Sequence, residues 1–398
     1  MVTDPGEATN LYAFYFPQFH EDELNSKLWG DRFTEWDRLK TVTKNRLGDD
    51  ILKPSEDLGY YNLLDKDVRK KHSDLAKRYG INGFIYHHYW FYQEKEGVLS
   101  KPLDQMLIDH EPNISFAMHW ANHPWLKTWS GHGGNSSRMN ELLHAQLYPT
   151  SPEDLKIKKH YEYLRPFFHH PNYIKIHGLP LFMIYEKRIE LRVLIPVLRK
   201  LAIQDGFPPP GLHIPEAFRG GMNTHPLGGL LSKKIHQKQL TPNFDAQFFY
   251  PSILDQSTKQ LKMPSYCYFQ TGREVKPSYA SLYTLFDNSP RRNIDVANIL
   301  NRKYSNCSSI DSFRHDLLEV MMYDRCCQHP KARKKGGKFV IINAWNEWGE
   351  GMVLEPSRQY GYGFLEAVNQ TKDLTSRLGC DWSAYHQYRS ASSHHSCS

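Results

Sequence analysis

Short runs of apolar and aromatic residues recur along the chain, and polar segments with helical spacing separate them. Most of these runs are continuous rather than alternating, which is typical of parallel strands covered on both faces. Eight runs are predicted to be strands: residues 11–17, 83–91, 114–122, 179–186, 212–218, 244–251, 282–287 and 338–345. Strands and helices that alternate in this way indicate an α/β fold, and eight of them favour a (β/α)8 TIM-like barrel.

Three of the intervening segments carry helix signals. Residues 65–80 place apolar side chains along one side and stop at a glycine, and residues 151–168 open with Ser-Pro followed by acidic residues. Residues 309–328 repeat the amphipathic pattern. An open doubly wound sheet would give the same local pattern, but no GxGxxG turn follows the first strand, so the barrel is favoured.

The same pattern sets the expected domain organisation. Residues 1–380 are predicted to form a single catalytic barrel, with long loops at 18–60 after the first strand and at 123–150 after the third. Loops of this length are often functional. Residues 381–398 are polar and rich in serine, which predicts a flexible tail.

Composition narrows the classes of partner. The net charge of the 398 residues is +7, and the basic stretch at 331–338 contains glycines and precedes an apolar strand, so we interpret it as a solvated loop. No nucleic-acid partner is therefore expected. No run of about eighteen apolar residues occurs, so no transmembrane segment is expected either. The oligomeric state is left open.

Six cysteines and four glycosylation sequons bear on the compartment. The cysteines form no CxxC pair and no dense framework, which favours a reduced compartment and a cytoplasmic protein. The sequons at Asn113, Asn135, Asn306 and Asn369 weigh only slightly the other way. The lumen of the secretory pathway remains the alternative if a signal segment has been removed upstream.

Aromatic, amide, histidine and acidic residues gather at or just after the predicted strand ends. In a parallel barrel these ends share one face, which carries the active site. Aromatic rings stack on the C–H face of a sugar while polar side chains bind its hydroxyls, so a glycan or sugar donor is the expected substrate. The candidate substrate-binding residues are Tyr15, Gln18, His20, Trp36, His88, Trp90, Trp120, Asn122, Trp129, Asp287, Asn288, Arg291, Trp345, Asn346 and Trp348.

Two glutamates in the stretch NAWNEWGEG at 343–351 are the candidate catalytic pair. Glu347 and Glu350 lie three residues apart, a spacing that brings side chains together on a helical turn. Paired carboxylates perform glycosidic chemistry when their pKa values differ, one held protonated by burial and by the charge of its neighbour. A structural salt bridge or loop cap is the alternative.

Metal chemistry is the competing interpretation of the histidines. His87, His88, His119 and His123 are the conceivable ligands among 21 histidines, but no HExxH or comparable spacing occurs. Adjacent strand residues point to opposite faces, so at most one of His87 and His88 enters the barrel. Neither a catalytic metal nor a cofactor is expected.

Seven motifs carry a family resemblance, and they follow one another in order along nearly the whole chain. They are LYAFYFPQFHEDELNSKLWGDRFTEWDRL at 11–39, GINGFIYHHYWF at 80–91, KPLDQML at 101–107, WANHPWLKTWSG at 120–131, LPLFMIY at 179–185, FDNSPRR at 286–292 and NAWNEWGEGMVLEP at 343–356. With them the chain resembles the WbsX-type glycosyltransferases, polysaccharide-assembly proteins related to the endo-α-mannosidase glycoside hydrolases. The resemblance implies a (β/α)8 barrel and a role in polysaccharide or glycan biosynthesis.

The resemblance also implies roles for the two glutamates. Glu350 is similar to the general acid that protonates the glycosidic oxygen in the hydrolase branch. Glu347 is similar to the base that takes a proton from the sugar 2-hydroxyl, whose oxygen then attacks the anomeric carbon. Water or an acceptor hydroxyl completes the reaction, so hydrolysis and transfer both stay open, as does a barrel that binds glycans without chemistry.

Three departures from the family pattern concern the substrate subsite. The family usually shows WANENW where this chain has Trp120-Ala121-Asn122-His123-Pro124-Trp125, so a histidine replaces an expected acid. A tyrosine-rich stretch is usual where His87 and His88 stand, and an aspartate is usual at Ser130. These changes leave the carboxylate pair intact, so the resemblance does not name the sugar.

Overall fold

A computed structural model describes residues 9–126, 142–218, 244–249, 268–271, 274–292, 297, 299–300, 309–326 and 330–393. Nine parallel strands in these ranges form the main sheet, and an antiparallel strand extends it at one end. The nine are β1 (Asn10–Tyr15), β2 (Gly83–His88), β3 (Ser115–Trp120), β8 (Phe182–Ile184), β9 (Pro215–Phe218), β10 (Ala246–Phe249), β12 (Glu274–Tyr279), β13 (Ser281–Tyr283) and β16 (Phe339–Asn343). The antiparallel strand is β11 (Tyr268–Thr271).

The sheet closes on itself through β12 and β13. Only Ala280 separates these two strands in the sequence. β12 pairs in parallel with β10, and β13 pairs in parallel with β16, so residues 274–283 act as one strand that joins the two ends of the sheet. The described residues therefore form a barrel of eight strand positions, and the predicted (β/α)8 architecture is confirmed.

Each predicted strand run overlaps a barrel strand, but the seventh was placed too late. That strand lies at 274–283, whereas residues 286–287, within the predicted run 282–287, form β14 (Phe286–Asp287) and pair with β15 (Ile299–Leu300). Lys276, Pro277 and Ser278 interrupt the apolar pattern of the true strand. Lys276 is buried nonetheless, because its ammonium group donates to the carbonyl oxygen of Phe244.

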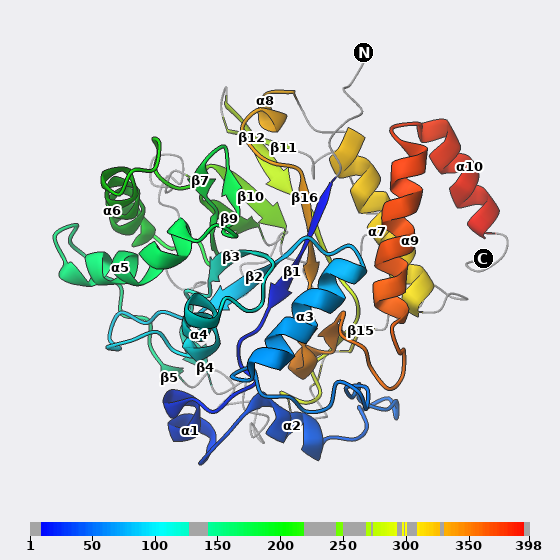
Figure 1. The fold of residues 1–398 in the computed structure, drawn as a ribbon, viewed down its shortest axis with the longest axis horizontal. Helices are drawn as coiled ribbons and strands as arrows, with labels where there is room; N and C mark the ends of the chain where they lie inside the picture. The colour runs from blue at the N-terminus through cyan, green and yellow to red at the C-terminus, as the bar shows by residue number, and fades with distance from the viewer. Residues whose placement is uncertain are drawn as a thin grey trace, which may run out of the picture.

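Helices cover the barrel (Figure 1). The sequence expectation of helices at 65–80, 151–168 and 309–328 is confirmed by α3, α5 and α7, with α5 starting after its N-cap Asp154. Figure 1 shows α5 and α6 on one flank and α7 and α9 on the other. The helices are α1 (Glu23–Trp29), α2 (Glu35–Thr41), α3 (Lys66–Arg78), α4 (Lys101–Asp109), α5 (Leu155–His169), α6 (Leu191–Gln204), α7 (Ser309–Cys326), α8 (Pro330–Arg333), α9 (Gly363–Leu378) and α10 (Trp382–Ser393).

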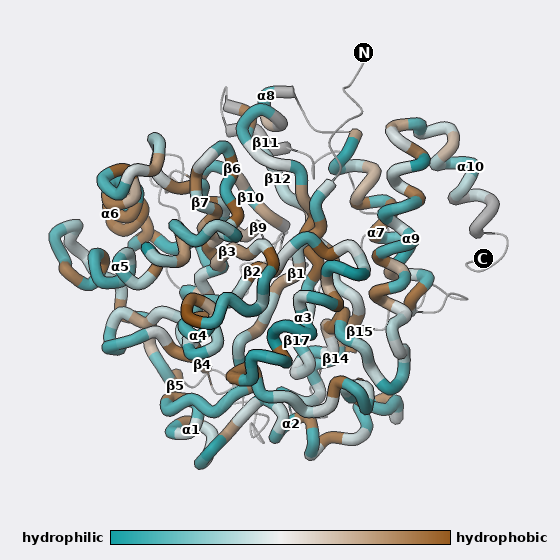
Figure 2. The backbone as a smooth tube through the Cα atoms, viewed as in Figure 1, coloured by the Kyte–Doolittle hydropathy of each residue, from teal (hydrophilic) through white to brown (hydrophobic). Residues whose placement is uncertain are grey.

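Apolar residues concentrate in the central strands, and hydrophilic stretches lie mostly at the periphery (Figure 2). Inside the barrel, Phe14 of β1 meets His119 of β3 at a ring distance of 4.9 Å and Phe248 of β10 at 6.1 Å. Since β1 and β10 are not neighbours in the sheet, these contacts cross the interior. The barrel is therefore a packed core, and chemistry is confined to its mouth.

The two long loops carry structure of their own. Residues 18–60 contain α1 and α2, which Figure 1 places at the lower edge of the molecule, where β1 points. After β3, the short strands β4 (Trp125–Leu126) and β5 (Leu142–His144) pair with each other. A further short pair, β6 (Lys175–Ile176) and β7 (Leu179–Pro180), precedes β8.

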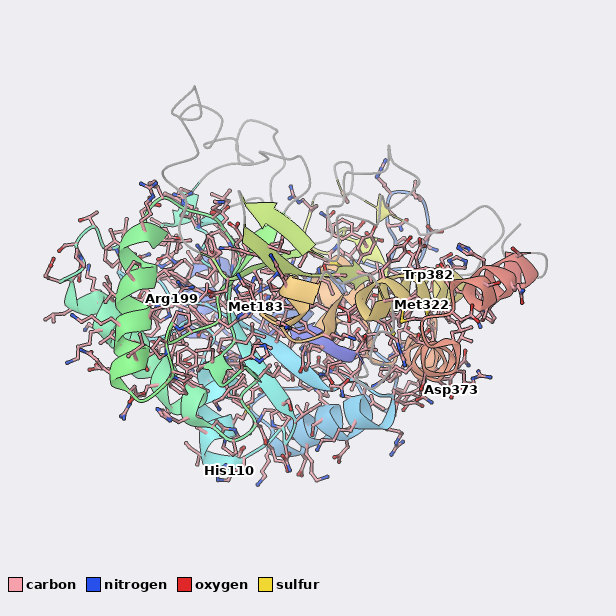
Figure 3. The ribbon with its side chains drawn as sticks, turned by 90° about the horizontal axis from the view of Figure 1, so that it is seen from above. His110, Met183, Arg199, Met322, Asp373 and Trp382 are labelled. Atoms are coloured by element: carbon pink, nitrogen blue, oxygen red, sulfur yellow. A yellow bond between two sulfur atoms is a disulfide. The ribbon has the colours of Figure 1, made fainter. Side chains whose placement is uncertain are left out.

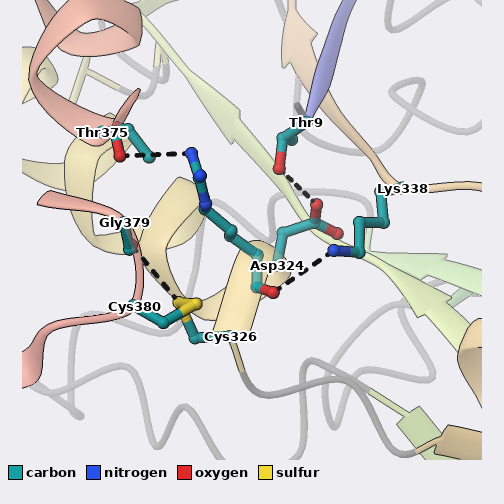
Figure 4. Close-up of a disulfide and its surroundings, with 8 residues drawn as sticks. Thr9, Asp324, Cys326, Lys338, Thr375, Gly379 and Cys380 are labelled. Atoms are coloured by element: carbon teal, nitrogen blue, oxygen red, sulfur yellow. Dashed lines mark hydrogen bonds between the residues drawn. A yellow bond between two sulfur atoms is a disulfide. The ribbon is translucent and has the colours of Figure 1, made fainter. Parts of the chain in front are cut away.

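Within the predicted tail at 381–398, the structure describes residues up to 393. Residues 382–393 form α10, and Tyr385 is buried against Leu318 and Met322 of α7. A disulfide joins Cys326, at the end of α7, to Cys380, just before α10 (Figure 4). Figure 3 shows Met322 and Trp382 at the same end of the molecule. The cysteine spacing gave no sign of this bond, because the partners are 54 residues apart and meet only through folding.

Within the described ranges, no helix combines the length and the apolarity needed to cross a membrane.

Candidate active site

The candidate catalytic pair lies on a tight hairpin that follows the last barrel strand. β17 (Asn346–Glu347) pairs with β18 (Met352–Val353), and the 3-10 turn η6 (Trp348–Glu350) connects them. A 3-10 turn has three residues per turn, so side chains at positions i and i+3 lie on the same side. The turn closes at Gly351, whose φ of +67° suits glycine. This geometry brings Glu347 and Glu350 together, as their spacing predicted.

Both glutamates contact one arginine. Arg291 Nη2 lies 2.9 Å from Glu347 Oε1, and Arg291 Nη1 lies 3.3 Å from Glu350 Oε1. The arginine side chain is 5% exposed, so its charge is held almost entirely within the protein. Two carboxylates on one guanidinium form a compact charged site at the mouth of the barrel.

The loop after β1 adds two groups to the same arginine. Arg291 Nε lies 3.4 Å from Glu35 Oε2 on α2, and Arg291 Nη2 donates to Gln18 Oε1 at 3.3 Å. Gln18 in turn donates to the Tyr89 hydroxyl at 3.2 Å. Gln18 and Arg291 were predicted to bind sugar, and the structure brings both to the carboxylate pair.

Gly349 provides the space that Arg291 occupies. A Cβ atom at position 349 would lie 2.5 Å from Arg291 Nε and 3.0 Å from its Cζ. These distances are far below an ordinary van der Waals contact. The glycine between the two glutamates therefore lets the guanidinium pack against the backbone of the turn.

The environment of Glu347 favours its protonated form. Burial raises the pKa of Glu347 well above its usual range, the charge of Arg291 opposes this shift, and Glu350 and Glu35 add to it. Glu347 Oε2 is buried and has no hydrogen-bond partner among the described residues. The same carboxylates raise the pKa of Arg291, although burial acts against them, so this arginine stays charged.

An aromatic and imidazole wall adjoins the carboxylate site. His87 stacks on Phe16 at 3.9 Å and meets His119 at 4.8 Å, while His123 meets Tyr185 at 4.9 Å. Burial lowers the pKa of His87 well below its usual value, so His87 is neutral near pH 7. Among the described residues, no three His, Cys, Asp or Glu side chains are arranged to hold a metal ion.

Several predicted residues form the framework beneath the hairpin. Asn346 accepts from the backbone N–H of Phe16 at 2.8 Å and donates to the Phe16 carbonyl at 3.0 Å, which ties the hairpin to the end of β1. Trp348 is buried and donates to Glu355 Oε2 at 2.7 Å. Trp36 is buried and donates to the Tyr61 carbonyl at 2.7 Å.

A buried polar network continues this framework. The Tyr61 hydroxyl lies 2.8 Å and 3.0 Å from the two Glu355 oxygens, and His72 Nε2 lies 3.1 Å from Glu355 Oε1. Tyr15 contacts His72 Nδ1 through its hydroxyl at 2.8 Å, and the ring of Trp345 lies 6.0 Å from the His72 ring. Tyr15 and Trp345 therefore support the site from below.

Burial raises the pKa of Glu355 to about 8, although hydrogen bonds from Trp348 and Tyr61 oppose the shift. It lowers the pKa of His72 to about 3. Glu355 and His72 are thus both uncharged at neutral pH, which suits a pair that is shielded from water.

Asp287 and Asn288 lie beside the hairpin and Arg291, whereas His20 is buried near Asp22. Asp287 accepts from Asn45 at 3.0 Å and from the backbone of Ser289 at 2.9 Å, and its backbone N–H lies 3.2 Å from where a Cβ at Gly351 would be. Asn288 is buried, and its carbonyl accepts from the Arg291 backbone at 3.0 Å. His20 is buried after β1, and burial lowers its pKa to about 4.

Four predicted residues lie elsewhere. His88 contacts His160 of α5 at 2.9 Å, and Trp90 stacks on that same imidazole at 4.8 Å. Trp120 is buried and packs against His160 from β3. His88 of β2 and Trp120 of β3 face outward at their strand positions, so it is His87 that enters the barrel. Asn122 bonds Tyr148 and both backbone groups of Glu186, clipping two loops together.

Trp129, the last predicted residue, falls outside the described residues. Whether any of the predicted residues binds a substrate stays a prediction.

The list of candidate substrate-binding residues left out five side chains of this neighbourhood, of which His87 and His123 were considered only as metal ligands: Glu35, Tyr89, His87, His123 and Tyr185. Glu35 lies 256 residues from Arg291 in the sequence, and no local spacing links them. His88 was predicted to bind substrate, but strand alternation allows only one of His87 and His88 to enter the barrel. The neighbouring strand alternates in the same way: Phe14 meets the ring of His87, and Tyr15 contacts His72.

Solved structures share the fold. A glycoside hydrolase-like protein has a TM-score of 0.54 at 15% identity, with 93% of this chain and 96% of that chain covered. A GH99 endo-alpha-mannosidase from Bacteroides thetaiotaomicron has a TM-score of 0.53 at 14% identity, with 94% and 99% covered. At these identities the likeness is one of fold.

Relatives by sequence extend well beyond this chain. The chain is 28% identical over 381 residues to the uncharacterized protein WxcX of Xanthomonas campestris pv. campestris strain B100, which covers 90% of this chain and 49% of that protein. WxcX of strain ATCC 33913 matches to the same extent. The chain thus spans about half the length of these relatives. The family model for glycosyltransferase WbsX matches residues 11–368, and the chain belongs to this family.

Proposed function

We propose that this protein makes or breaks a glycosidic bond in a glycan, with Glu347 and Glu350 handling the protons. The observation that carries the proposal is the convergence of both carboxylates on Arg291 at the mouth of the barrel. Transfer to an acceptor, as in polysaccharide or glycan biosynthesis, is the first activity we infer, because the family is a glycosyltransferase family. The alternative is endo-acting hydrolysis of an α-mannoside, the activity for which the structural neighbour is named.

The environments of the two acids fit different roles. Glu347 is 1% exposed and has one carboxylate oxygen without a hydrogen-bond partner among the described residues, whereas the Glu350 side chain is 18% exposed. A buried carboxylate with a raised pKa is a stronger base once ionised, and it is shielded from competing water. Burial favours the protonated form of Glu347, so it must first lose that proton to act; we assign the base to Glu347, as the family resemblance implies, and the acid to the more exposed Glu350.

The proposed reaction follows from these positions. Ionised Glu347 takes the proton of the sugar 2-hydroxyl, and that oxygen forms a bond to the anomeric carbon. The bond from this carbon to the leaving oxygen breaks, and the electron pair on the leaving oxygen takes the proton of Glu350. An acceptor hydroxyl or water then opens the strained ring, returning a proton to Glu350 while O2 regains its proton from Glu347.

Labelled α-mannoside oligosaccharides, incubated with the protein with and without activated sugar donors and acceptor glycans, test this function. Mass spectrometry of the products separates the alternatives: an extended acceptor means transfer, and a shortened oligosaccharide in water means hydrolysis. A protein that binds these glycans but converts none of them, with every donor class tried, would be a binding module, and the proposal would fall.

A further inference from the structure

Glu35 is an acidic residue at the site that neither proton step uses. It stands on α2, and its side chain is 9% exposed. Its carboxylate approaches the Nε edge of Arg291, while Glu347 and Glu350 approach the two terminal nitrogens. The three acids described here therefore divide one guanidinium between them, and each carboxylate forgoes a bidentate pairing with it.

We propose that Glu35 is a positioning residue: it holds Arg291 between Glu347 and Glu350 and thereby sets the proton occupancy of that pair. This role rests on the function proposed above. Glu35 acts on the pair in two ways: its carboxylate contacts the guanidinium of Arg291, and its negative charge repels that of Glu347.

Geometry gives the direction of the effect. With Glu35 present, its charge repels a second negative charge on Glu347 and competes for the cation that would stabilise that charge. Without the Glu35 charge, this repulsion is absent, and Arg291 pairs with Glu347 and Glu350 alone among the three acids. Both changes favour ionised Glu347, so neutralising Glu35 should make Glu347 lose its proton at lower pH.

Other charged or titratable groups face the cluster from the neighbouring elements. Arg38 of α2 faces Glu35 and Arg291, and Arg292 faces Glu350. His87, near the end of β2, and Tyr89, just after it, lie close enough to Arg291 for its charge to act on their pKa values. Burial raises the pKa of Tyr89 and lowers that of His87, so both stay neutral around pH 7. Neither can replace the charge of Glu35 in this range.

A carbon-13 NMR titration tests the inference without a substrate. The protein carries carbon-13 at the glutamate carboxyl carbons, and the Glu347 resonance is identified by its loss in Glu347→Gln. The matched control is Glu21→Gln, the same chemical change in the same loop, at a half-exposed glutamate that pairs with Arg32. We expect Glu35→Gln to lower the titration midpoint of Glu347 by about one pH unit or more and Glu21→Gln to leave it in place.

A second variant protects the test against misfolding. Should Glu35→Gln lose the circular dichroism of the native protein, Glu35→Asp replaces it, because aspartate keeps the charge but draws it back from Arg291 Nε. The Glu347 midpoint in Glu35→Asp should lie below that of the native protein. An unchanged or raised midpoint in the folded variant overturns the inference.

The pH dependence of turnover separates this inference from the proposed function. If both hold, Glu35→Gln stays active and the acidic limb of its pH–rate profile moves to lower pH with the NMR midpoint. If Glu347→Gln and Glu350→Gln keep full turnover, the proposed function fails, and the NMR midpoint still decides the role of Glu35. If those variants are inactive but the limb and the midpoint stay in place in Glu35→Gln, the function stands and the role of Glu35 is refuted.

Discussion

At the residue scale, the site depends on buried polar groups that are paired with nearby side chains. Glu347 is buried against Arg291, and Glu355 is buried beneath it against Tyr61, Trp348 and His72. Glu347 is a proposed catalytic residue, and Glu355 supports the hairpin that carries Glu347. Buried polar groups of this kind are costly to leave unpaired, so changing either residue should have a measurable effect on stability or on turnover.

Glu355 should make stability fall as pH rises. Its pKa is about 8 in the folded protein, above the ordinary 4.5, so its contribution is fully present below about pH 4.5 and is lost as pH rises through 8. Urea unfolding across this range should show a loss of up to a few kcal/mol in the native protein. Glu355→Gln, which cannot ionise, should flatten this part of the curve, and parallel curves for the two proteins would refute the assignment.

At the element scale, the hairpin between β17 and β18 depends on its two glycines. Gly351 closes the turn with a positive φ, and Gly349 leaves room for Arg291. The arginine arrives from the segment after β14, so the hairpin is completed by a contact distant in sequence.

Gly349→Ala should displace Arg291 and separate it from the glutamates. We expect a loss of roughly 1–3 kcal/mol in stability from the overpacked turn, together with a fall in turnover larger than any fall in glycan binding. Gly337→Ala is the control, because its added carbon would approach only the end of the Ile176 side chain, at 3.1 Å. Equal effects of the two substitutions would show that Arg291 does not need the space at Gly349.

The disulfide between Cys326 and Cys380 is the second feature that acts between elements. Figure 4 shows it near Thr375 and near the contact of Asp324 with Thr9. Arg325 donates to the Thr375 carbonyl at 3.3 Å, so other bonds already join the ends of α7 and α9 that the disulfide links. Cys380→Ser should lower the free energy of unfolding by about 2–4 kcal/mol under non-reducing conditions. Peptide mapping without reductant provides the direct check: free Cys326 and Cys380 in the native protein would contradict the pairing. The cellular compartment stays a prediction.

At the scale of the whole molecule, the sequence predicts architecture better than it predicts the site. Continuous apolar runs identified the barrel because burial on both faces leaves a local signature. Glu347 and Glu350 could be paired from their spacing, since the turn that joins them is itself local. Glu35 and its contact with Arg291 could not, because barrel closure and the loop after β1 bring them together across 256 residues.

The tryptophans at strand ends also show that side-chain direction is hard to predict from the sequence. Trp120 and Trp345 were expected to face sugar because they stand near the mouth, but both are fully buried. Nearness to a strand end fixes the height of a residue in the barrel, whereas the direction of its side chain depends on strand register. A one-residue change in register moves a side chain from the barrel interior to the face that the helices cover.

The central claim is that Glu347 and Glu350 perform the chemistry at the barrel mouth. The most direct measurement compares turnover and binding of one converted glycan for the native protein, Glu347→Gln, Glu350→Gln and the exposed control Glu366→Gln. The account predicts at least a hundredfold loss of turnover in both site variants, with glycan affinity retained and the control unchanged. Native turnover in either site variant would contradict it.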